Sequence, residues 1–293
     1  LFPLFTPAKD IIDPLIARLR EERIRCFYGQ EVTEIASDGV VLRSGERIPG
    51  DAVVVATGFT LFDAHRKQEY GYGLYDNVIT SVDLERMMNS GRVVLTDGSE
   101  PRRIAFLHCV GSRDEKVDQK HCSKVCCITG VKQAIEIKQM FPDADVFNFY
   151  MDIRMYGPGY EELYRSAQQD YNIHFIRGRI SEAAETINKR IQIKAEDTLT
   201  GRPLRMTVDM LVLLVGMSAN YENKNLAQSA GIPLAPNGYF RVQDSFLGSV
   251  TCEREGIFFA GAATAPKSLA DTLTEASLTA SAVCNYIKVK YTK

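Results

Sequence analysis

Four of the seven cysteines in this chain stand close together, at Cys109, Cys122, Cys126 and Cys127. Thiolate sulfur binds zinc and iron–sulfur clusters, and it is also the reacting atom of disulfide chemistry. An odd number of cysteines in a chain of 293 residues does not match the disulfide framework of a small secreted domain. We therefore expect a reducing, cytoplasmic compartment. The remaining cysteines occur singly and are expected to lie in or near the core: Cys26, Cys252 and Cys284.

The spacing of the cysteine segment, C-x12-C-x3-C-C, bears on which chemistry it serves. Zinc sites usually combine two C-x2-4-C pairs, which this segment lacks, although His108 and His121 offer nitrogen ligands. A C-x2-C redox pair is absent, and a disulfide between the adjacent Cys126 and Cys127 would be strained. Four thiolates are the ligand set of a [4Fe–4S] cluster. The spacing favours an iron–sulfur site, while zinc and a thiol-only site remain open.

The overall composition is that of a soluble globular protein with one large or two medium domains. Hydrophobic residues make up 45% and charged residues 25%, with a formal net charge of −2. Because no basic run is present, we expect no nucleic-acid partner. The apolar run "MLVLLVG" at 210–216 is too short to cross a membrane and predicts a buried strand.

Strand and helix patterns alternate in the middle of the chain. They predict strands at 102–110, 144–153 and 172–178, separated by helices at 123–141 and 159–171. This alternation is typical of a parallel sheet with crossover helices. The segments on either side look like parts of a second nucleotide-binding domain, so we expect an inserted domain. The expected divisions are 101–215 for the inserted unit, with 1–100 and 216–293 forming the split outer domain.

The flanking segments predict further elements. We expect a helix at 10–22, a short strand at 24–29, and hairpins that turn at Asp38-Gly39 and Ser44-Gly45. Another helix is expected at 81–90 with Ser81 as its cap, and a second meander at 184–215. Near the end, "GIFFAGAATAP" predicts a strand and a small-residue turn before a long helix that begins near Leu269.

Two strand ends have the small residues that let a backbone approach a flat, phosphate-bearing ligand. "VVVATG" ends in Ala56, Thr57 and Gly58, and "GIFFAG" ends at Gly261. No G-x-G-x-x-G motif is present; "GPGYEE" at 157–162 has glutamate in place of the third glycine and is expected to be a turn. In the central unit, the cysteines occupy the usual phosphate loop. This arrangement predicts that a pyridine-nucleotide site has been replaced.

Three segments carry a resemblance to a known family: "CVGSRDE…HCSKVCC…KQA", "EYGYGLYDNVITSVDLERMM" and "FNFYMDIRMYGPGYEELY". From about Ile48 onward the chain resembles the A subunits of heterodisulfide reductase and of the quinone-interacting membrane-bound oxidoreductase. The resemblance implies an α/β, thioredoxin-reductase-like flavoprotein whose FAD-binding domain is split around an NAD(P)-domain-like unit. The phosphate loop for FAD would then lie before Leu1. The implied cofactors are FAD and a non-standard [4Fe–4S] cluster, bound by Cys109, Cys122, Cys126 and Cys127.

The resemblance also implies residues at the flavin. Lys132 matches a lysine that lies near the flavin N5, where it would stabilise the reduced ring. The strand-end and helix-start residues expected to approach the flavin are Ala56, Thr57, Gly58, Gly261, Pro266, Lys267, Asp271 and Thr272. Many flavoproteins have Gly-Asp at this strand end, whereas this chain has Gly261-Ala262. Asp271 or a backbone group would therefore bind the ribityl hydroxyls.

The implied function is electron transfer between FAD, the cluster and partner subunits, with electron bifurcation by analogy with the family. Expected partners are heterodisulfide reductase B- and C-like or quinone-linked subunits, ferredoxin or hydrogenase modules, and a second copy in a homodimer. Three alternatives remain open. The first is an NAD(P)-dependent disulfide reductase, although such an enzyme needs a cysteine pair and a phosphate loop that are not seen here. The second is a zinc-stabilised interaction module without redox function. The third is a degenerate subunit that binds no cofactor.

Overall fold

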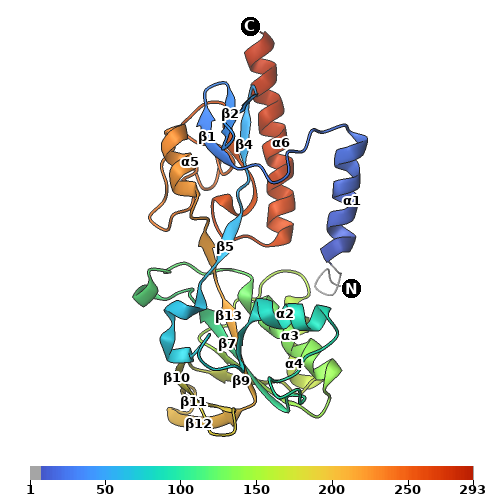
Figure 1. Ribbon diagram of the computed structural model, residues 1–293, viewed down its shortest axis with the longest axis vertical. Helices are drawn as coiled ribbons and strands as arrows, with labels where there is room; N and C mark the ends of the chain where they lie inside the picture. Colours follow the sequence, from blue (N-terminus) through green and yellow to red (C-terminus); the bar gives the residue numbers. More distant parts are fainter. Residues whose placement is uncertain (1–7, 293) are drawn as a thin grey trace.

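The computed structural model describes residues 8–292 as two lobes stacked along one axis (Figure 1). The central lobe is built on a five-stranded parallel sheet in the order β6-β13-β7-β8-β9. Its strands are β6 (Val78–Thr80), β7 (Arg103–Val110), β8 (Asp145–Tyr150), β9 (His174–Arg177) and β13 (Met210–Val215). Every position of β13 is buried, as expected of a central parallel strand covered on both faces. The predicted parallel sheet and the buried strand at 210–216 are confirmed.

The two faces of this sheet are covered by different elements. One face packs against α2 (Ser81–Asn89), α3 (Cys126–Met140) and α4 (Tyr160–Gln169). The other packs against an antiparallel meander of β10 (Ile180–Glu185), β11 (Ile191–Asp197) and β12 (Arg202–Val208). Neighbouring residues of β7 therefore enter different cores, Phe106 toward the helices and Leu107 toward the meander. Because both faces of the sheet are packed, the ends of its strands have fixed positions.

The sheet starts earlier in the chain than the expected division at residue 101, because β6 pairs with β13. Helix α2 follows directly, and its cap is Thr80 rather than the expected Ser81. The Thr80 hydroxyl accepts from the backbone N–H of Asp83, and the Asp83 carboxylate accepts from the backbone N–H of Thr80. Both hydroxyl residues suit a cap, and the backbone geometry selects the first. Short helical turns precede β6 and follow β7: η2 (Ala64–Arg66) and η3 (Gln68–Tyr70) lie before β6, and η4 (Glu115–Val117) lies after β7.

The split lobe combines segments from both ends of the described chain. It contains α1 (Ala8–Glu21), the antiparallel β1 (Val32–Ala36), β2 (Gly39–Leu42) and β3 (Arg47–Pro49), and the parallel pair β4 (Val53–Val55) and β15 (Ile257–Phe259). It is completed by α5 (Asn223–Ala230), η5 (Gly261–Ala263) and α6 (Leu269–Thr292). The predicted helices, hairpins and long terminal helix are confirmed. Residues 1–7 and 293 of the expected outer-domain segments lie outside the described residues.

Two expectations in this lobe are wrong. Residues 24–29 form no strand, because they are exposed and pair with no neighbouring strand. Cys26 and Cys284 are exposed rather than in the core, whereas Cys252 is buried as expected. Cys284 lies on a helix with few buried positions, Glu275 and Thr279. Within residues 8–292, no helix has the length and apolar character needed to cross a bilayer.

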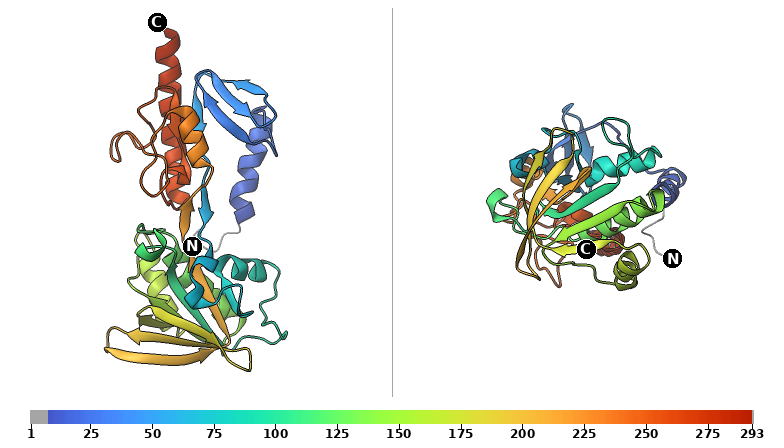
Figure 2. Two further views of the ribbon diagram at one scale, coloured as in Figure 1. Left: turned by 60° about the vertical axis from the view of Figure 1, so that its left-hand side comes forward. Right: turned by 90° about the horizontal axis from the view of Figure 1, so that it is seen from below.

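The lobes are joined by two short strands that run in opposite directions, β5 (Phe59–Leu61) and β14 (Met217–Ala219). Figure 2 shows from a second side that the chain crosses between the lobes here. Helix α6 begins at the end of the split lobe nearest the central lobe and runs away from it (Figure 1). The strand ends after β4 and β15, the start of α6, and the loop before α3 therefore lie around the same junction.

Candidate functional site

The backbone at the end of β7 has an unusual shape that sets the position of Cys109. His108 and Cys109 together lie opposite the single residue Leu214 of β13, so β7 bulges there. Cys109 has a φ of 61°, a left-handed conformation that non-glycine residues rarely adopt. Gly111 follows with a φ of 67°, and a Cβ there would lie 1.9 Å from the Phe62 ring. Strained backbone of this kind is characteristic of functional sites.

Three of the four cysteines influence one another's ionisation. The buried Cys126 thiol donates hydrogen bonds to the sulfurs of Cys109 and Cys127, and this raises the pKa of Cys126. The same hydrogen bonds favour the thiolates of its neighbours. They lower the pKa of Cys109 to about 7 and that of Cys127 to about 4, although burial opposes both shifts. The arrangement therefore stabilises anionic sulfur, the form that binds metals.

Backbone N–H groups supply further donors to sulfur. Lys124, with a φ of 64°, donates to the sulfur of Cys122 over 3.3 Å. Arg154 donates to the sulfur of Cys127 over 3.4 Å. Cys126 and Cys127 also open α3, where the positive end of the helix dipole favours negative charge.

The donor set suits a soft metal centre held by thiolates. Among residues 8–292, no three His, Cys, Asp or Glu side chains converge as ligands of a single metal ion. The buried sulfurs, the N–H donors and the helix start fit a cluster bound by Cys109, Cys122, Cys126 and Cys127. The four-ligand assignment itself stays a prediction.

The two flanking histidines are both held by neighbouring groups. His108 is buried, and its Nε2 lies 2.8 Å from Oδ1 of Asn148. Burial opposes its protonation, but hydrogen bonding to Cys127 and Asn148 outweighs this effect and raises the pKa of His108. The Nε2 of His121 lies 2.8 Å from the carbonyl oxygen of Met217 in the lobe connection. His108 is therefore buried beside the cysteine sulfurs, and His121 connects the cysteine loop to β14 through a hydrogen bond.

The strand ends expected to approach a flavin lie side by side. Strands β4 and β15 pair in parallel with Val55 opposite Phe259, so Ala56 and Gly58 follow β4 at the edge where Gly261 follows β15. Gly58 and Gly261 both have a φ of 68°. Only glycine adopts this conformation without cost, which explains these two residues at the turns. The two small-residue turns therefore lie at the same edge of this strand pair, while their contact with a flavin stays a prediction.

Side chains on both sides fix these turns. The Thr57 hydroxyl donates to Oδ1 of Asn223 over 2.9 Å, and Nδ2 of Asn220 donates to the Thr57 carbonyl over 3.1 Å. The ammonium of Lys267 donates to the carbonyl of Gly261 over 2.8 Å and pairs with Glu275 at 2.7 Å. Lys267 thus braces the Gly261 turn from within the lobe.

The remaining flavin-side residues lie at the start of α6. Pro266 is half-buried in the connection that leads to the helix. The Thr272 hydroxyl donates to the carbonyl of Ser268, and its methyl carbon lies 3.3 Å from where a Cβ on Gly261 would stand. The Asp271 carboxylate accepts from the backbone N–H and hydroxyl of Ser268, as in a helix capping box. These residues form one turn-and-cap unit.

Asp271 also reaches across the junction. Its carboxylate pairs with the ammonium of Lys124 at 2.6 Å, and Lys124 lies between the second and third cysteines. Burial opposes ionisation of Asp271, but hydrogen bonds from Lys124 and Ser268 outweigh it and lower its pKa to about 2. The cysteine loop is thereby connected directly to the start of α6.

Lys132 lies on α3 in a different environment. Its ammonium pairs with Glu85 of α2 and with Glu136, both at 3.4 Å. The side chain is 19% exposed. Its contact with a flavin N5 stays a prediction.

Sequence reasoning missed Arg113. Its guanidinium lies between the Cys109 sulfur and the carboxylate of Asp152, which it contacts at 2.8 Å. Burial opposes its charge, yet these partners raise the pKa of Arg113. An arginine in the loop just after Cys109 was the available signal, because cations stabilise nearby thiolates.

Comparison with solved structures identifies the class of fold. The chain superimposes on the thioredoxin reductase of T. acidophilum with a TM-score of 0.61 and 16% identity, covering 96% of this chain and 80% of that one. The sulfide:quinone oxidoreductase of Aquifex aeolicus matches with a TM-score of 0.54 and 14% identity, covering 93% of this chain and 63% of that one. This is the two-domain fold of thioredoxin-reductase-like flavoproteins, and the predicted fold class is confirmed.

Comparison with curated sequences identifies homologues. The chain is a homologue of the A subunits of heterodisulfide reductases. It is 43% identical over 240 residues to the iron–sulfur A subunit of the CoB–CoM heterodisulfide reductase of Methanocaldococcus jannaschii, covering 79% of this chain and 36% of that protein. It is 38% identical over 275 residues to the A subunit of the H2:CoB–CoM heterodisulfide, ferredoxin reductase of Methanothermobacter thermautotrophicus, covering 90% of this chain and 41% of that protein. The chain therefore spans well under half of these relatives, and no family model matches it.

Proposed function

We propose that this chain is the flavin- and cluster-binding part of an oxidoreductase subunit that transfers electrons within a heterodisulfide-reductase-like complex. The observation that carries the proposal is the ion pair between Lys124 and Asp271. It brings the cysteine loop to the turn-and-cap unit at which a flavin would bind. Redox groups bound at these two sites would exchange electrons directly, without a diffusing carrier. FAD would supply two-electron chemistry and a [4Fe–4S] cluster one-electron chemistry.

The residues of the chain have distinct parts in this function. The bulged end of β7 and the start of α3 hold the cysteine ligands, while the N–H groups of Lys124 and Arg154 stabilise their negative charge. The positive φ of Gly58 and Gly261 forms the tight turns at which a flat ring would bind, and Lys267 keeps the second turn in place. An ammonium at Lys132 would stabilise a reduced, anionic flavin.

The names of the relatives suggest the partners. They include ferredoxin-linked and hydrogen-linked heterodisulfide reductases, so we infer that the whole protein passes electrons to other subunits of such a complex. Quinone-linked subunits and a homodimer belong to the same proposal, as does bifurcation between two acceptors. The cysteine usage supports a reducing, cytoplasmic compartment for the protein.

The test is to measure iron, sulfide, zinc and flavin in the anaerobically purified chain and in the Cys126→Ser variant. About four iron and four sulfide per chain are expected, with flavin on the same sample. The variant should lose most of its iron, because three thiolates rarely hold a stable cube. Cys252→Ser is the matched control, since Cys252 is also buried but lies outside the cysteine loop. About one zinc in place of iron, or unchanged iron in Cys126→Ser, would contradict the proposed cluster.

A further inference from the structure

A cavity of about 740 Å³ opens on the central lobe beyond the ends of β8 and β9, separate from the turns assigned to the flavin. Its volume falls within the roughly 300–1,000 Å³ typical of small-molecule sites. In open parallel sheets, ligands bind at the carboxyl ends of the strands, and this cavity lies at that edge. Its walls come from the cysteine loop, the two strand ends and the meander, and include Arg113, Met151, Asp152, Arg177, Arg179 and Thr198.

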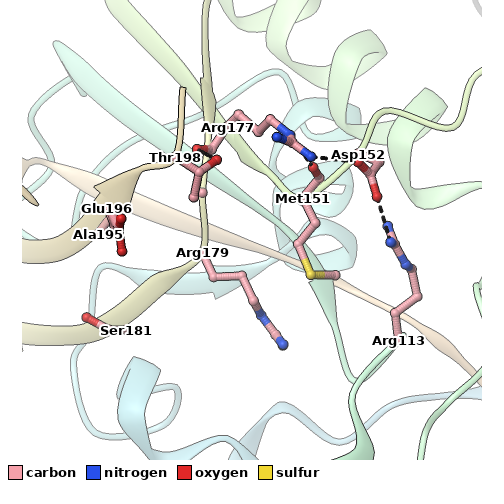
Figure 3. A pocket seen from close by; sticks show the side chains of 10 residues that line it. Arg113, Met151, Asp152, Arg177, Arg179, Ser181, Ala195, Glu196 and Thr198 are labelled. Atoms are coloured by element: carbon pink, nitrogen blue, oxygen red, sulfur yellow. Dashed lines mark hydrogen bonds and ion pairs between the residues drawn. The ribbon is translucent and has the colours of Figure 1, made fainter. Parts of the chain in front are cut away.

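Arginine dominates the charge of the lining. The Arg113 and Arg177 side chains converge on Asp152, at 2.8 and 3.5 Å, and Met151 extends between Arg113 and Arg179 (Figure 3). The single carboxylate of Asp152 therefore forms ion pairs with two guanidinium groups. Arg177 is 45% exposed, whereas Arg113 is only 19% exposed. Arg177 can therefore pair with an incoming anion more readily than Arg113 can.

Arg179, which also lines the cavity, likewise shares its acidic partner with a second cation. It pairs at 3.0 Å with Asp114, which is itself 2.8 Å from the ammonium of Lys67. Lys67 also contacts Glu69, and Glu196 lines the meander wall. Even with these acids included, the cavity presents two accessible guanidinium groups, each sharing its acid with another cation. Guanidinium groups bind phosphate through paired, planar hydrogen bonds.

The cavity also has an apolar part. Met151 projects into it from the end of β8, and Ala195 contributes from the meander. Flat guanidinium planes and a polarizable thioether both pack well against an aromatic ring. The volume suits a single nucleotide. A dinucleotide would need the phosphate loop before α3, and the cysteines occupy it.

We propose that this cavity binds a phosphate-bearing small molecule of mononucleotide size, with its phosphate paired to Arg177, its ring against Met151, and Arg179 on the far side of Met151. The site does not depend on the flavin or on the cluster. Its failure and the failure of the proposed redox function are therefore distinguishable. Because Arg113 contacts both Asp152 and Cys109, the ligand would lie one side chain away from the cysteine site.

The test is isothermal titration of the full chain with AMP, inorganic phosphate and citrate, with iron and flavin content measured on each sample. AMP should bind, phosphate should bind more weakly, and Arg177→Gln should weaken AMP binding by about tenfold or more. Arg179→Gln is the second variant if Arg177→Gln fails to fold. Arg241→Gln is the control, because Arg241 also forms a single exposed ion pair, with Glu253. Undetectable AMP binding, equal binding of citrate, or an equal loss in Arg241→Gln would overturn the proposal.

Discussion

The ion pair between Lys124 and Asp271 should stabilise the contact between the two lobes by a measurable amount. The fall in the pKa of Asp271 from its ordinary 3.8 to about 2, which hydrogen bonds from Lys124 and Ser268 cause together against the effect of burial, corresponds to roughly 2 kcal/mol before solvent screening. Because the Asp271 side chain is 37% exposed and Lys124 is 31% exposed, screening reduces this figure to about 1 kcal/mol. The same carboxylate also caps α6, so Asp271→Asn loses both contributions, whereas Lys124→Gln loses only the pair.

A double-mutant cycle separates the two contributions. Urea unfolding of the wild type, Lys124→Gln, Asp271→Asn and the double variant at about pH 7 should give a coupling energy of about 1 kcal/mol. The folded pKa of Asp271 lies below its unfolded value. The stabilisation is therefore complete above its ordinary pKa of 3.8 and is lost as the pH falls toward about 2. The coupling energy should accordingly be smaller at about pH 3 than at pH 7.

The matched control is the ion pair between Lys194 and Glu182, which are 42% and 52% exposed and lie within the meander. Its coupling energy should be at most about 0.5 kcal/mol. A Lys124–Asp271 coupling no larger than this control, or one that does not change between pH 7 and pH 3, would refute the reasoning. It would also remove the observation on which the proposed proximity of the two redox groups rests.

Two further substitutions probe the cysteine loop and the helix behind it. Gly111→Ala should destabilise the fold by about 3 kcal/mol or more in urea unfolding, because it combines a positive φ with a clash against Phe62. The control Gly98→Ala, with a φ of 84° but open space around the new Cβ, should cost about 1 kcal/mol. Equal losses of stability in the two variants would show that the clash with Phe62 is relieved. Lys132→Ala should shift the flavin midpoint potential and leave the iron content unchanged. Lys138→Ala on the same helix is the control. An unaltered flavin potential in Lys132→Ala would exclude the proposed contact between Lys132 and the flavin.

Local sequence patterns predicted the central sheet because its strands are buried on both faces. The run at 210–216 has no polar position, so only a covered central strand can accommodate it. The segment at 24–29 has similar β-forming residues but is exposed and unpaired, and propensity without a partner strand forms no strand. The boundary near residue 101 was harder to predict. The three-residue strand β6 gives almost no pattern, and only its pairing with β13 shows where it belongs.

In the candidate site as well, some residues could be predicted from local sequence and others could not. The cysteine spacing and the small residues after two strands are local signals, and they indicated residues that the fold places around one junction. The contacts between Lys124 and Asp271 and between Arg113 and Asp152 join distant segments. They depend on how the lobes meet and how the loop turns. No periodicity or motif encodes those features, so these contacts became visible only in three dimensions.

The loop before α3 connects these observations. In a nucleotide-binding unit, a tight glycine turn at this position would bring backbone N–H groups and the helix start toward a phosphate. Here the bulge at His108 and Cys109, together with the positive φ of Cys109, directs sulfur to that place instead. The helix start still favours negative charge, now on Cys127. The electrostatic property that suits this edge of the sheet to phosphate also suits it to thiolate. The proposed cluster would thus require no change of fold.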